Sequence, residues 1–309
     1  MKIVFMGTPE FALPGLRALA ASRHQILAVV TGQDVPKGRG RKVDEPPVKT
    51  LARELGLEIL QPESLRDEQL AGRLRQLDPD LFVVVAFRIL PKLLLEVPRF
   101  GSINLHASLL PKYRGAAPIN WALINGDRET GITIFQIEPK VDTGAIITRR
   151  RLTISEDDTA GSLSEKLSRI GAEALVQSLD DLENAHITKL AQDNSLASSA
   201  PKIYPEMGKL DWSQPAQTLK NLIHGLSPSP GAFCLFGGKR LKILKASWKE
   251  DPAAELPGTI VHLDKSALAI QTGRGLLCPE VLQTEGKRAL PVAAFLNGFA
   301  GQIGDRFTS

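Results

Sequence analysis

The chain has 309 residues, of which 43% are hydrophobic, and its formal net charge of +4 is small for that length. At roughly 100–200 residues per domain, this length predicts two domains, each able to bury its own core. The small net charge excludes a chain that is basic throughout, so a nucleic-acid surface would have to be local.

Cysteine usage and hydropathy exclude further classes of protein. Cys234 and Cys278 are far apart and form no CxxC motif, which argues against a disulfide framework or a zinc site and fits a reducing compartment. No run approaches the ~18–20 apolar residues that cross a bilayer. The apolar start, residues 2–6, is too short for a signal peptide. We therefore expect a soluble, cytoplasmic protein without a metal.

Short apolar runs alternate with helical patterns through the first half of the chain. The runs are rich in Val, Ile and Leu, which is typical of a parallel sheet covered on both faces. The pattern predicts a doubly wound, Rossmann-like α/β domain. The expected strands are 2–6, 24–31, 57–60, 80–87 and 101–107, and the expected helices are 9–22, 46–56 and 66–78.

The second half changes character after one long helix. A strand is expected at 144–155 and an amphipathic helix at 159–182. Residues 190–202 are small and polar, as in a linker. The short runs beyond them, broken by Gly and Pro, predict a small β-barrel or sandwich. We therefore divide the chain into a first domain at 1–189, a linker at 190–203 and a second domain at 204–309.

A polar constellation lies on the strand expected at 101–107 and just after it. Asn104, His106 and Ser108 are two apart and should share one face of an extended strand. An amide donor beside an imidazole can stabilise an oxyanion. Asp142, expected in the next β–α connection, can orient the ring. This set suits attack on an acyl or formyl carbon, and the chain has no GxSxG nucleophile motif. The alternative is a capped His and an ordinary turn.

A basic loop lies between the strand at 24–31 and the helix at 46–56. In "GQDVPKGRGRKVDEPP", glycines alternate with cations, which suits an arm that folds onto phosphates. The alternative is a solvated surface. Neither GxGxxG nor a Walker motif is present, so a nucleotide cofactor is not expected. The candidate RNA-binding residues are Lys37, Arg39, Arg41 and Lys42.

The stretch "INLHASLLPKYRGAAPINWALINGDRETGITI" with "VDTG" resembles the folate-dependent formyltransferases. "FMGTPEFA", "KGRGRK", "LDW", "GLSPSPGA" and "FLNG" place the resemblance in the branch that formylates methionine on initiator tRNA. It implies catalysis by Asn104, His106 and Asp142, 10-formyltetrahydrofolate as the formyl donor, the basic loop on the acceptor stem, and an OB-like second domain that binds tRNA. It also implies a monomer.

The same resemblance implies a folate site around two loops. Phe87-Arg88 stands where many members of this branch have Tyr-Gly, which puts the role of the Arg88 side chain in doubt. The alternative is that the leucines here only pack the core. The implied folate-binding residues are Ser108, Leu109, Leu110, Pro111, Arg88, Ile89 and Leu90.

Three other functions fit parts of the sequence. A formyltransferase for a small amine, such as a sugar nucleotide or glycinamide ribonucleotide, explains the site but not the basic loop or the second domain. An NAD-dependent oxidoreductase lacks its GxGxxG, because Thr8-Pro9-Glu10 follows the first strand. A non-catalytic RNA-binding protein has no need of all three polar residues.

Overall fold

The computed structural model describes the chain except for residues 38–41, 187 and 253. Its contacts divide it into two compact units. Unit 1 comprises residues 1–115, 129–153 and 164–200, and unit 2 comprises residues 116–128, 154–163 and 201–309. Both units are therefore discontinuous in sequence, which a division at one linker does not anticipate.

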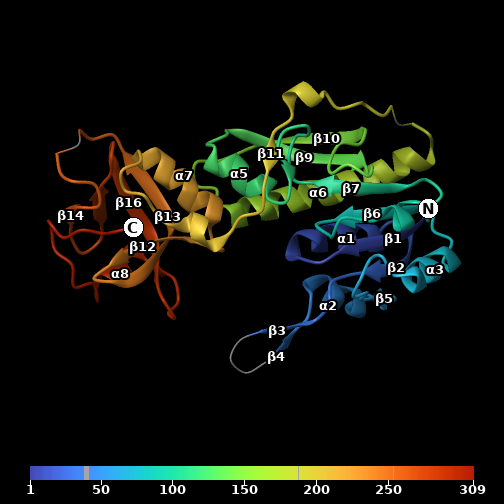
Figure 1. Cartoon of the computed structure of the whole chain (residues 1–309), viewed down its shortest axis with the longest axis horizontal. Helices are drawn as coiled ribbons and strands as arrows, with labels where there is room; N and C mark the ends of the chain where they lie inside the picture. Colours follow the sequence, from blue (N-terminus) through green and yellow to red (C-terminus); the bar gives the residue numbers. More distant parts are fainter. Residues whose placement is uncertain (38–41, 187, 253) are drawn as a thin grey trace. The chain divides into compact units, whose positions relative to one another are not determined.

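In the described part of unit 1, a seven-stranded sheet has the order β10-β9-β7-β6-β1-β2-β5 (Figure 1). Strands β7, β6, β1, β2 and β5 run parallel, while β9 is antiparallel to β7 and β10 is antiparallel to β9. The bounds are β1 Lys2–Gly7, β2 Gln25–Val30, β5 Ile59–Leu60, β6 Leu81–Val85, β7 Ser102–His106, β9 Glu129–Gln136 and β10 Ile146–Thr153.

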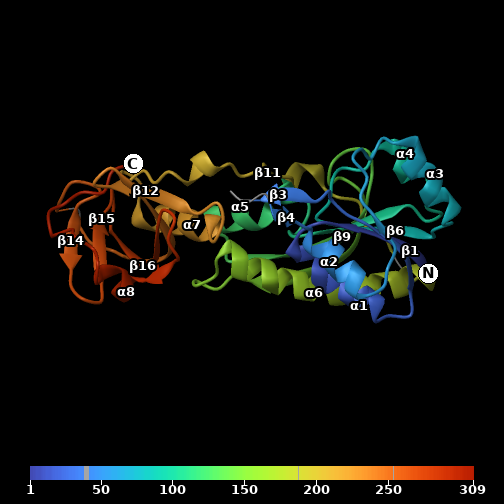
Figure 2. The same ribbon diagram turned by 90° about the horizontal axis from the view of Figure 1, so that it is seen from below.

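Helices cover both faces of this sheet. Figure 2 shows α3 and α4 on one side of the strands and α1 and α6 on the other. Leu74 of α3 and Leu94 of α4 belong to a buried cluster with Val4 and Phe82. On the other face, Gly15 of α1 lies against Leu175 of α6. The bounds are η1 Glu10–Ala12, α1 Leu13–Ala20, α2 Pro47–Glu54, α3 Glu68–Gln76, α4 Lys92–Leu95 and α6 Ala160–Glu183.

Local sequence explains where these helices begin. The Asp67 carboxylate accepts a hydrogen bond from Gln69 N at 2.9 Å and caps α3. Pro14 lies at the start of α1, where a missing N–H leaves no hydrogen bond unmade. The helix expected at 9–22 is nevertheless divided, because η1 precedes α1. None of the described helices combines the length and apolar character needed to cross a bilayer.

Unit 2 contains an antiparallel sheet of order β12-β13-β16-β15-β14, with β17 paired to β16. Residues 304–308 form backbone hydrogen bonds with both edge strands of this sheet, β12 and β14. Leu235 of β12 exchanges two backbone hydrogen bonds with Thr308, and Gly304 N donates to Ile260 O in β14 at 2.9 Å. The sheet therefore closes into a barrel. The bounds are β12 Ala232–Phe236, β13 Lys239–Lys249, β14 Ile260–Leu263, β15 Leu268–Gln271, β16 Leu276–Thr284 and β17 Leu290–Pro291.

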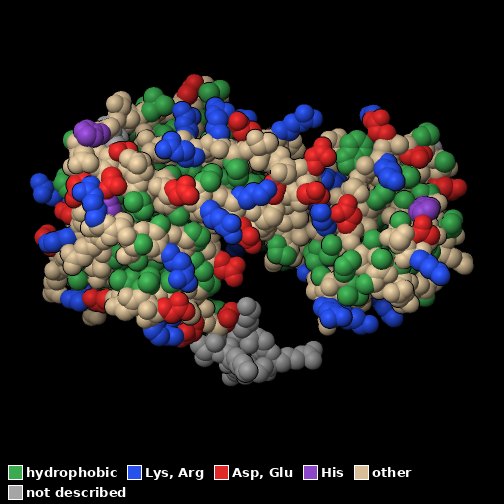
Figure 3. All heavy atoms as spheres, turned by 180° about the vertical axis from the view of Figure 1, so that it is seen from behind, with side chains coloured by type: hydrophobic (Ala, Val, Ile, Leu, Met, Phe, Trp, Pro, Cys, Tyr) green, Lys and Arg blue, Asp and Glu red, His purple; other side chains and the backbone are tan. Residues whose placement is uncertain are grey.

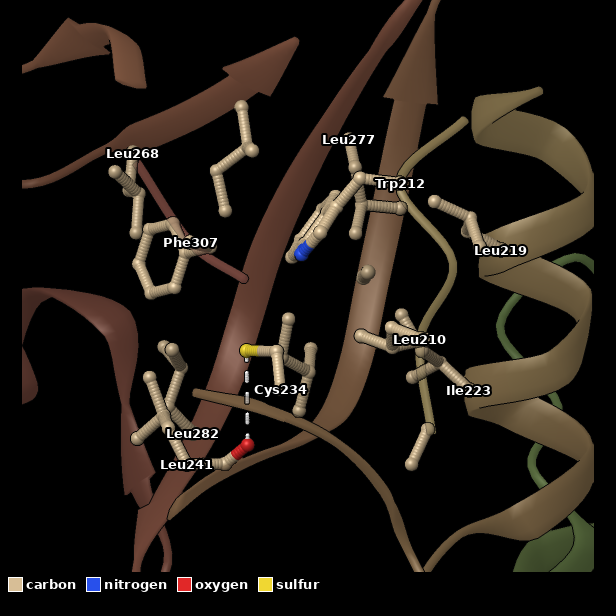
Figure 4. Close-up of a cluster of buried hydrophobic side chains, with 14 of the residues drawn as sticks. Leu210, Trp212, Leu219, Ile223, Cys234, Leu241, Leu268, Leu277, Leu282 and Phe307 are labelled. Atoms are coloured by element: carbon tan, nitrogen blue, oxygen red, sulfur yellow. Dashed lines mark hydrogen bonds between the residues drawn. The ribbon is translucent and has the colours of Figure 1, made fainter. Parts of the chain in front are cut away.

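An apolar cluster fills this barrel and extends to α7 (Ala216–Leu226) (Figure 4). Trp212, Leu219 and Phe307 point into it, and Phe307 is 1% exposed. Cys234 also lies inside, with its Sγ 3.7 Å from Leu241 O. Burial raises the pKa of its thiol to about 12. Cys234 is therefore a packing residue and not a reactive one.

The predicted fold class is confirmed: a doubly wound α/β sheet and a smaller antiparallel β domain. The segment expected to be a linker carries more structure than its composition indicated. It contains η2 (Asn194–Leu196) and β11 (Ser199–Ala200), which pairs with β8 (Arg114–Gly115). On the face drawn in Figure 3, Lys and Arg side chains are interspersed with Asp and Glu, in keeping with the small net charge.

A buried histidine joins two parts of unit 2. His224 Nδ1 lies 3.0 Å from Asp158 O, and Nε2 lies 2.9 Å from Ala246 O and 3.3 Å from Ala246 N. Asp158 O and Ala246 O both only accept, so a neutral ring, which has a single N–H, donates to one of these carbonyls and not to the other. Burial, followed by the positive charge of Lys220, lowers the pKa of His224.

We expect acid to destabilise the protein through His224. Its pKa is lower in the folded state than the unfolded value of about 6.5. The unfolded state therefore binds more protons as the pH falls below about 6.5, and the free energy of unfolding decreases until the folded pKa is passed. Urea unfolding at a series of pH values should show a shallower decrease for His224→Gln.

Two features make this measurement specific. Burial also lowers the pKa of His24, so part of the pH dependence remains in the variant. The exposed His186 provides a matched control, and His186→Gln should retain the wild-type slope. An unchanged slope in His224→Gln would show that the buried ring does not cause the acid sensitivity.

Candidate active site

Strand β7 presents two polar side chains on the sheet face opposite α6. Leu105 points toward α6, since a methyl group added to Gly171 would lie 2.7 Å from its Cδ2. Asn104 and His106 flank Leu105 and therefore point to the opposite face. Among the described residues, the Asn104 side chain has no hydrogen-bond partner, and it is partly exposed. The predicted common direction of Asn104 and His106 thus agrees with the packing of Leu105.

The His106 ring is held by a backbone carbonyl. Its Nε2 lies 2.8 Å from Tyr113 O. A carbonyl oxygen only accepts, so Nε2 must be the donor, and Nδ1 is the nitrogen left for reacting groups. Nδ1 lies 3.8 Å from Oδ2 of Asp142, which is an ion-pair distance for a protonated ring and too long for a direct hydrogen bond. Phe135 meets the ring edge-on at 6.4 Å between centroids.

Asp142 reaches this face from a connection between antiparallel strands, which corrects the expected β–α connection. The connection joins β9 to β10. It begins at the amino end of β7, where Ile137 N donates to Ser102 O at 2.7 Å, and returns along the face to His106 at its carboxyl end. Asp142 has a φ of +53°, and its Oδ2 accepts a hydrogen bond from Gly115 N at 2.8 Å.

The turn after β7 is ordered by side chains within it and beside it. Ser108 is fully buried, and its Oγ donates to Lys112 O at 2.6 Å. Thr133 Oγ1 bridges this turn, because it donates to Ser108 O at 2.7 Å and accepts from Leu110 N at 3.0 Å. Leu110 packs in the core, and the Leu110–Pro111 peptide bond is cis. A ligand at these positions would therefore meet mainly backbone groups.

The loop after β6 lies beside this turn, because β6 and β7 are parallel neighbours. Ile89 is 73% exposed, whereas Leu90 is buried in the core. The Arg88 guanidinium donates to Pro62 O and Glu63 O, both at 3.0 Å. Burial lowers the pKa of Arg88, although a guanidinium still keeps its charge. Arg88 thus fastens a neighbouring loop, and Ile89 offers an apolar surface.

The candidate RNA-binding residues are divided between described and undescribed positions. Lys37 ends β3 (Val35–Lys37) and Lys42 begins β4 (Lys42–Asp44), and the two residues are paired in an antiparallel hairpin. Arg39 and Arg41 lie outside the described residues. The hairpin itself was not expected from the Gly-rich sequence.

Two side chains near Asp142, those of Gln192 and Arg114, were not predicted from the sequence. Gln192, in the expected linker, donates to Asp142 O at 3.0 Å and accepts from Arg114 Nη2 at 2.7 Å. Arg114 lies in the quoted stretch that carries the family resemblance, although nothing in that stretch gives it a role, and Gln192 lies in no motif or periodic pattern. A single glutamine in a polar segment carries no signal by which sequence alone would select it.

Within the described residues, one group of side chains has the spacing of metal ligands: His24, Asp180 and Glu183. Arg23 already pairs with Asp180 at 2.6 Å and with Glu183 at 2.8 Å. His24 also precedes β2 and thus lies at the amino edge of the parallel strands, away from the polar face of β7. This group is an ion-pair network, and we propose no metal there.

Family models match both parts of the chain. The model described as "Formyl transferase" matches residues 1–179, and "Formyl transferase, C-terminal domain" matches residues 202–300. A relative from Geobacter metallireducens named methionyl-tRNA formyltransferase is 46% identical over 299 residues, which cover 96% of each chain. One of the same name from Moorella thermoacetica is 43% identical over 300 residues, which cover 97% of this chain and 96% of the relative.

Solved structures share the fold at low identity. WlaRD, described as a sugar 3N-formyl transferase with dTDP and 5-N-formyl-THF, has a TM-score of 0.68 at 20% identity, over 93% of this chain and 99% of that one. HypX from Aquifex aeolicus in complex with tetrahydrofolic acid has a TM-score of 0.65 at 18% identity, over 99% and 48%. These likenesses concern the fold alone.

Proposed function

The chain belongs to the formyl transferase family, and from this premise we propose that it is a methionyl-tRNA formyltransferase. It transfers the formyl group of 10-formyltetrahydrofolate to the α-amino group of methionine on initiator tRNA, for translation initiation. The observation that carries the proposal is the 46% identity, over 96% of both chains, to a relative of that name. The facing His106 and Asp142 supply the chemistry that such a transfer requires.

The reaction needs two tasks from the site. The methionine amine attacks the formyl carbon, a C–N bond forms, and the carbonyl oxygen becomes an oxyanion. Asn104 and the protonated form of His106, through its Nδ1–H, donate hydrogen bonds to this oxyanion. Asp142 takes the proton that the attacking amine loses. Collapse then breaks the bond from the formyl carbon to N10, and the proton held by Asp142 passes to N10 as tetrahydrofolate leaves.

The folate is proposed to lie along the carboxyl ends of β6 and β7, where ligands bind in open α/β sheets. Exposed Ile89 would meet its flat ring, together with Leu109 and Pro111. Backbone groups of Ser108, Leu110 and Leu90 would provide the polar contacts, because these three side chains are buried. Arg88 would contribute by fixing its loop.

Single-turnover transfer tests this proposal. The purified protein is mixed with 10-formyltetrahydrofolate and methionyl initiator tRNA, with free methionine and a UDP-4-amino sugar as competing acceptors. Fast formylation of the tRNA alone is expected. Preferred transfer to a small amine would contradict the substrate and leave a formyltransferase of the alternative kind. The solved structures described as sugar formyltransferases are under 25% identical to this chain and show only a shared fold.

We expect the basic loop to act through phosphates. Replacing Arg39 and Arg41 with Ala should raise KM for methionyl-tRNA about tenfold at moderate salt, since charge supplies most non-specific affinity. The slope of log(kcat/KM) against log[salt] should fall by roughly 0.7–0.9 for each phosphate that the variant no longer neutralises. The folate KM should stay unchanged. A steady-state series at several salt concentrations measures both quantities.

The control removes two arginines from elsewhere in unit 1. Arg17 and Arg75 lie on α1 and α3 with side chains 61% and 52% exposed. Their double Ala variant should keep the wild-type tRNA KM and salt slope. Equal effects in both double variants would show that the loop provides only general charge.

Three further expectations belong to the proposal. Residues 1–189 would form the catalytic domain and 204–309 the OB-like tRNA-binding domain, joined by 190–203. The protein would act as a monomer in the cytoplasm, where charged initiator tRNA is used. The two family models support this division, since one matches residues 1–179 and the other matches residues 202–300.

A further inference from the structure

Residues 190–200 pack onto the turn that holds His106, and we name them the strap. Ser198 is attached to this turn at three points. Its Oγ accepts a hydrogen bond from Tyr113 N at 2.9 Å, its N donates to Pro111 O at 3.4 Å, and its O accepts from Arg114 N at 2.8 Å. The carbonyl of Tyr113 is the group that fixes the His106 ring. The strap is therefore bound to one half of the candidate site.

Gln192 binds the strap to the other half. Its Nε2 donates to Asp142 O at 3.0 Å and to Gly144 O at 2.8 Å. Its Oε1 accepts from the Nε and Nη2 of Arg114 at 3.2 and 2.7 Å. A guanidinium only donates and a carbonyl only accepts, so the amide has a single orientation that satisfies all four bonds. The amide oxygen and the amide nitrogen of Gln192 therefore each form two hydrogen bonds, all of them beside Asp142.

The backbone that Gln192 holds is constrained. Asp142 has a φ of +53°, a left-handed conformation that persists only where the surroundings fix it. Gly144 allows the loop to pass close to the backbone of Gln136, since a methyl group at position 144 would lie 1.7 Å from Gln136 O. The Gln192 amide donates to the carbonyls of Asp142 and Gly144, and so fixes the backbone at both of these residues. On the side-chain end, Gly115 N donates to Oδ2.

We propose that Gln192 is a positioning residue for formyl transfer, which holds the Asp142 carboxylate at 3.8 Å from His106 Nδ1. The proposal rests on the proposed function and deepens it. Gln192 acts through the loop that carries Asp142, since its amide nitrogen donates to the backbone carbonyls of Asp142 and Gly144. Misplacing a reacting group by about 1 Å costs on the order of 10²-fold in rate. Loss of the amide should therefore reduce catalysis more than binding.

The test uses Gln192→Ala and Gln192→Glu. The Glu variant keeps acceptor oxygens for Arg114 but places an oxygen against the carbonyls of Asp142 and Gly144. For both variants, kcat with methionyl-tRNA should fall about 10- to 10²-fold. The dissociation constant for tetrahydrofolate and the melting temperature should stay close to those of the wild type. This separation of kcat from binding distinguishes positioning from general loosening.

Asn194→Ala is the matched control. Asn194 also lies in the strap and accepts from Arg114 Nη2 at 2.9 Å, but it makes no bond to the Asp142 loop among the described residues. Its kcat should equal that of the wild type. The proposal is overturned if Gln192→Ala keeps its full kcat, or if Asn194→Ala loses as much.

Hydrogen exchange at the Gly115 amide gives a readout without substrate. This amide donates to Asp142, so it should exchange faster in Gln192→Ala and not in Asn194→Ala. If the wild-type protein fails to formylate methionyl-tRNA, the proposed function fails. Faster Gly115 exchange would then still support Gln192 as the residue that positions Asp142. Unchanged exchange would overturn that role.

Discussion

Replacing Asp142 with Asn should lower kcat for formyl transfer by about 10²- to 10⁴-fold, the range that a general acid or base contributes. The fold should survive. Asn tolerates the left-handed conformation at φ +53°, and its amide oxygen can accept the Gly115 N–H in place of Oδ2. What disappears is the negative charge 3.8 Å from His106 Nδ1, together with the proton acceptor. Single-turnover rates and thermal unfolding measure the two effects.

The same substitution at another acid of unit 1 controls for the general loss of a charge. Asp67 caps α3 through Gln69 N, and Asn caps a helix about as well as Asp. Asp67→Asn should therefore keep both the rate and the melting temperature. A kcat for Asp142→Asn near that of the wild type would mean that the reaction does not use this carboxylate.

Phe307→Ala should destabilise unit 2 by about 3–5 kcal/mol, the usual cost of removing a buried aromatic ring. The ring is 1% exposed and lies 4.8 Å from Phe236 and 5.8 Å from Trp212 between centroids. Its backbone also helps to close the barrel, because Phe307 N donates to Gly258 O at 2.9 Å. The variant therefore leaves a cavity where the barrel closes.

Tryptophan fluorescence during urea unfolding reports this destabilisation selectively. The three tryptophans of the chain, Trp121, Trp212 and Trp248, all belong to unit 2. Phe100→Ala is the control, because that ring is 48% exposed and lies in unit 1. A surface change of this kind shifts stability by only about 0.5 kcal/mol. A similarly small effect in Phe307→Ala would show that the barrel closes without this ring.

The fold class was open to prediction because its signals are periodic. A parallel strand buried on both faces reads as a run such as "LFVVV", which forms β6. A long amphipathic helix reads as a stripe of leucines, and the helix expected at 159–182 differs from α6 by one residue at each end. The ends of the helices were harder to predict from the sequence. The division of 9–22 into η1 and α1 depends on contacts that periodicity does not report.

The candidate site was predictable only along one strand. The two-residue period of β7 places Asn104 and His106 on a common face, whatever packs above them. The approach of Asp142 depends on a loop that returns along the sheet, and no short-range pattern encodes such a path. The backbone acceptor that holds His106 was also invisible, since a carbonyl at Tyr113 has no sequence signature.

The strap shows why composition misled at residues 190–203. Small polar residues without periodicity are typical of linkers, but they also suit a segment whose work is hydrogen bonding to other loops. Ser198 and Gln192 each form hydrogen bonds with residues of the 111–115 turn, and Gln192 also bonds to the loop that carries Asp142. Only the folded chain brings these partners together, so polar composition alone does not separate the two cases.

Expressing residues 1–200 and residues 201–309 as separate chains would not yield two proteins that fold independently. Helix α5 (Pro118–Ile124) belongs to unit 2, where Asn120 donates to Gly225 O at 2.7 Å and Leu123 is buried nearby. A fragment of residues 1–200 would carry α5 without its partner α7, and a fragment of residues 201–309 would leave His224 without Asp158. Residues 116–128 and 154–163 of unit 2 lie between stretches of unit 1 in the sequence. Each truncated chain would therefore expose apolar surface, which favours aggregation over independent folding.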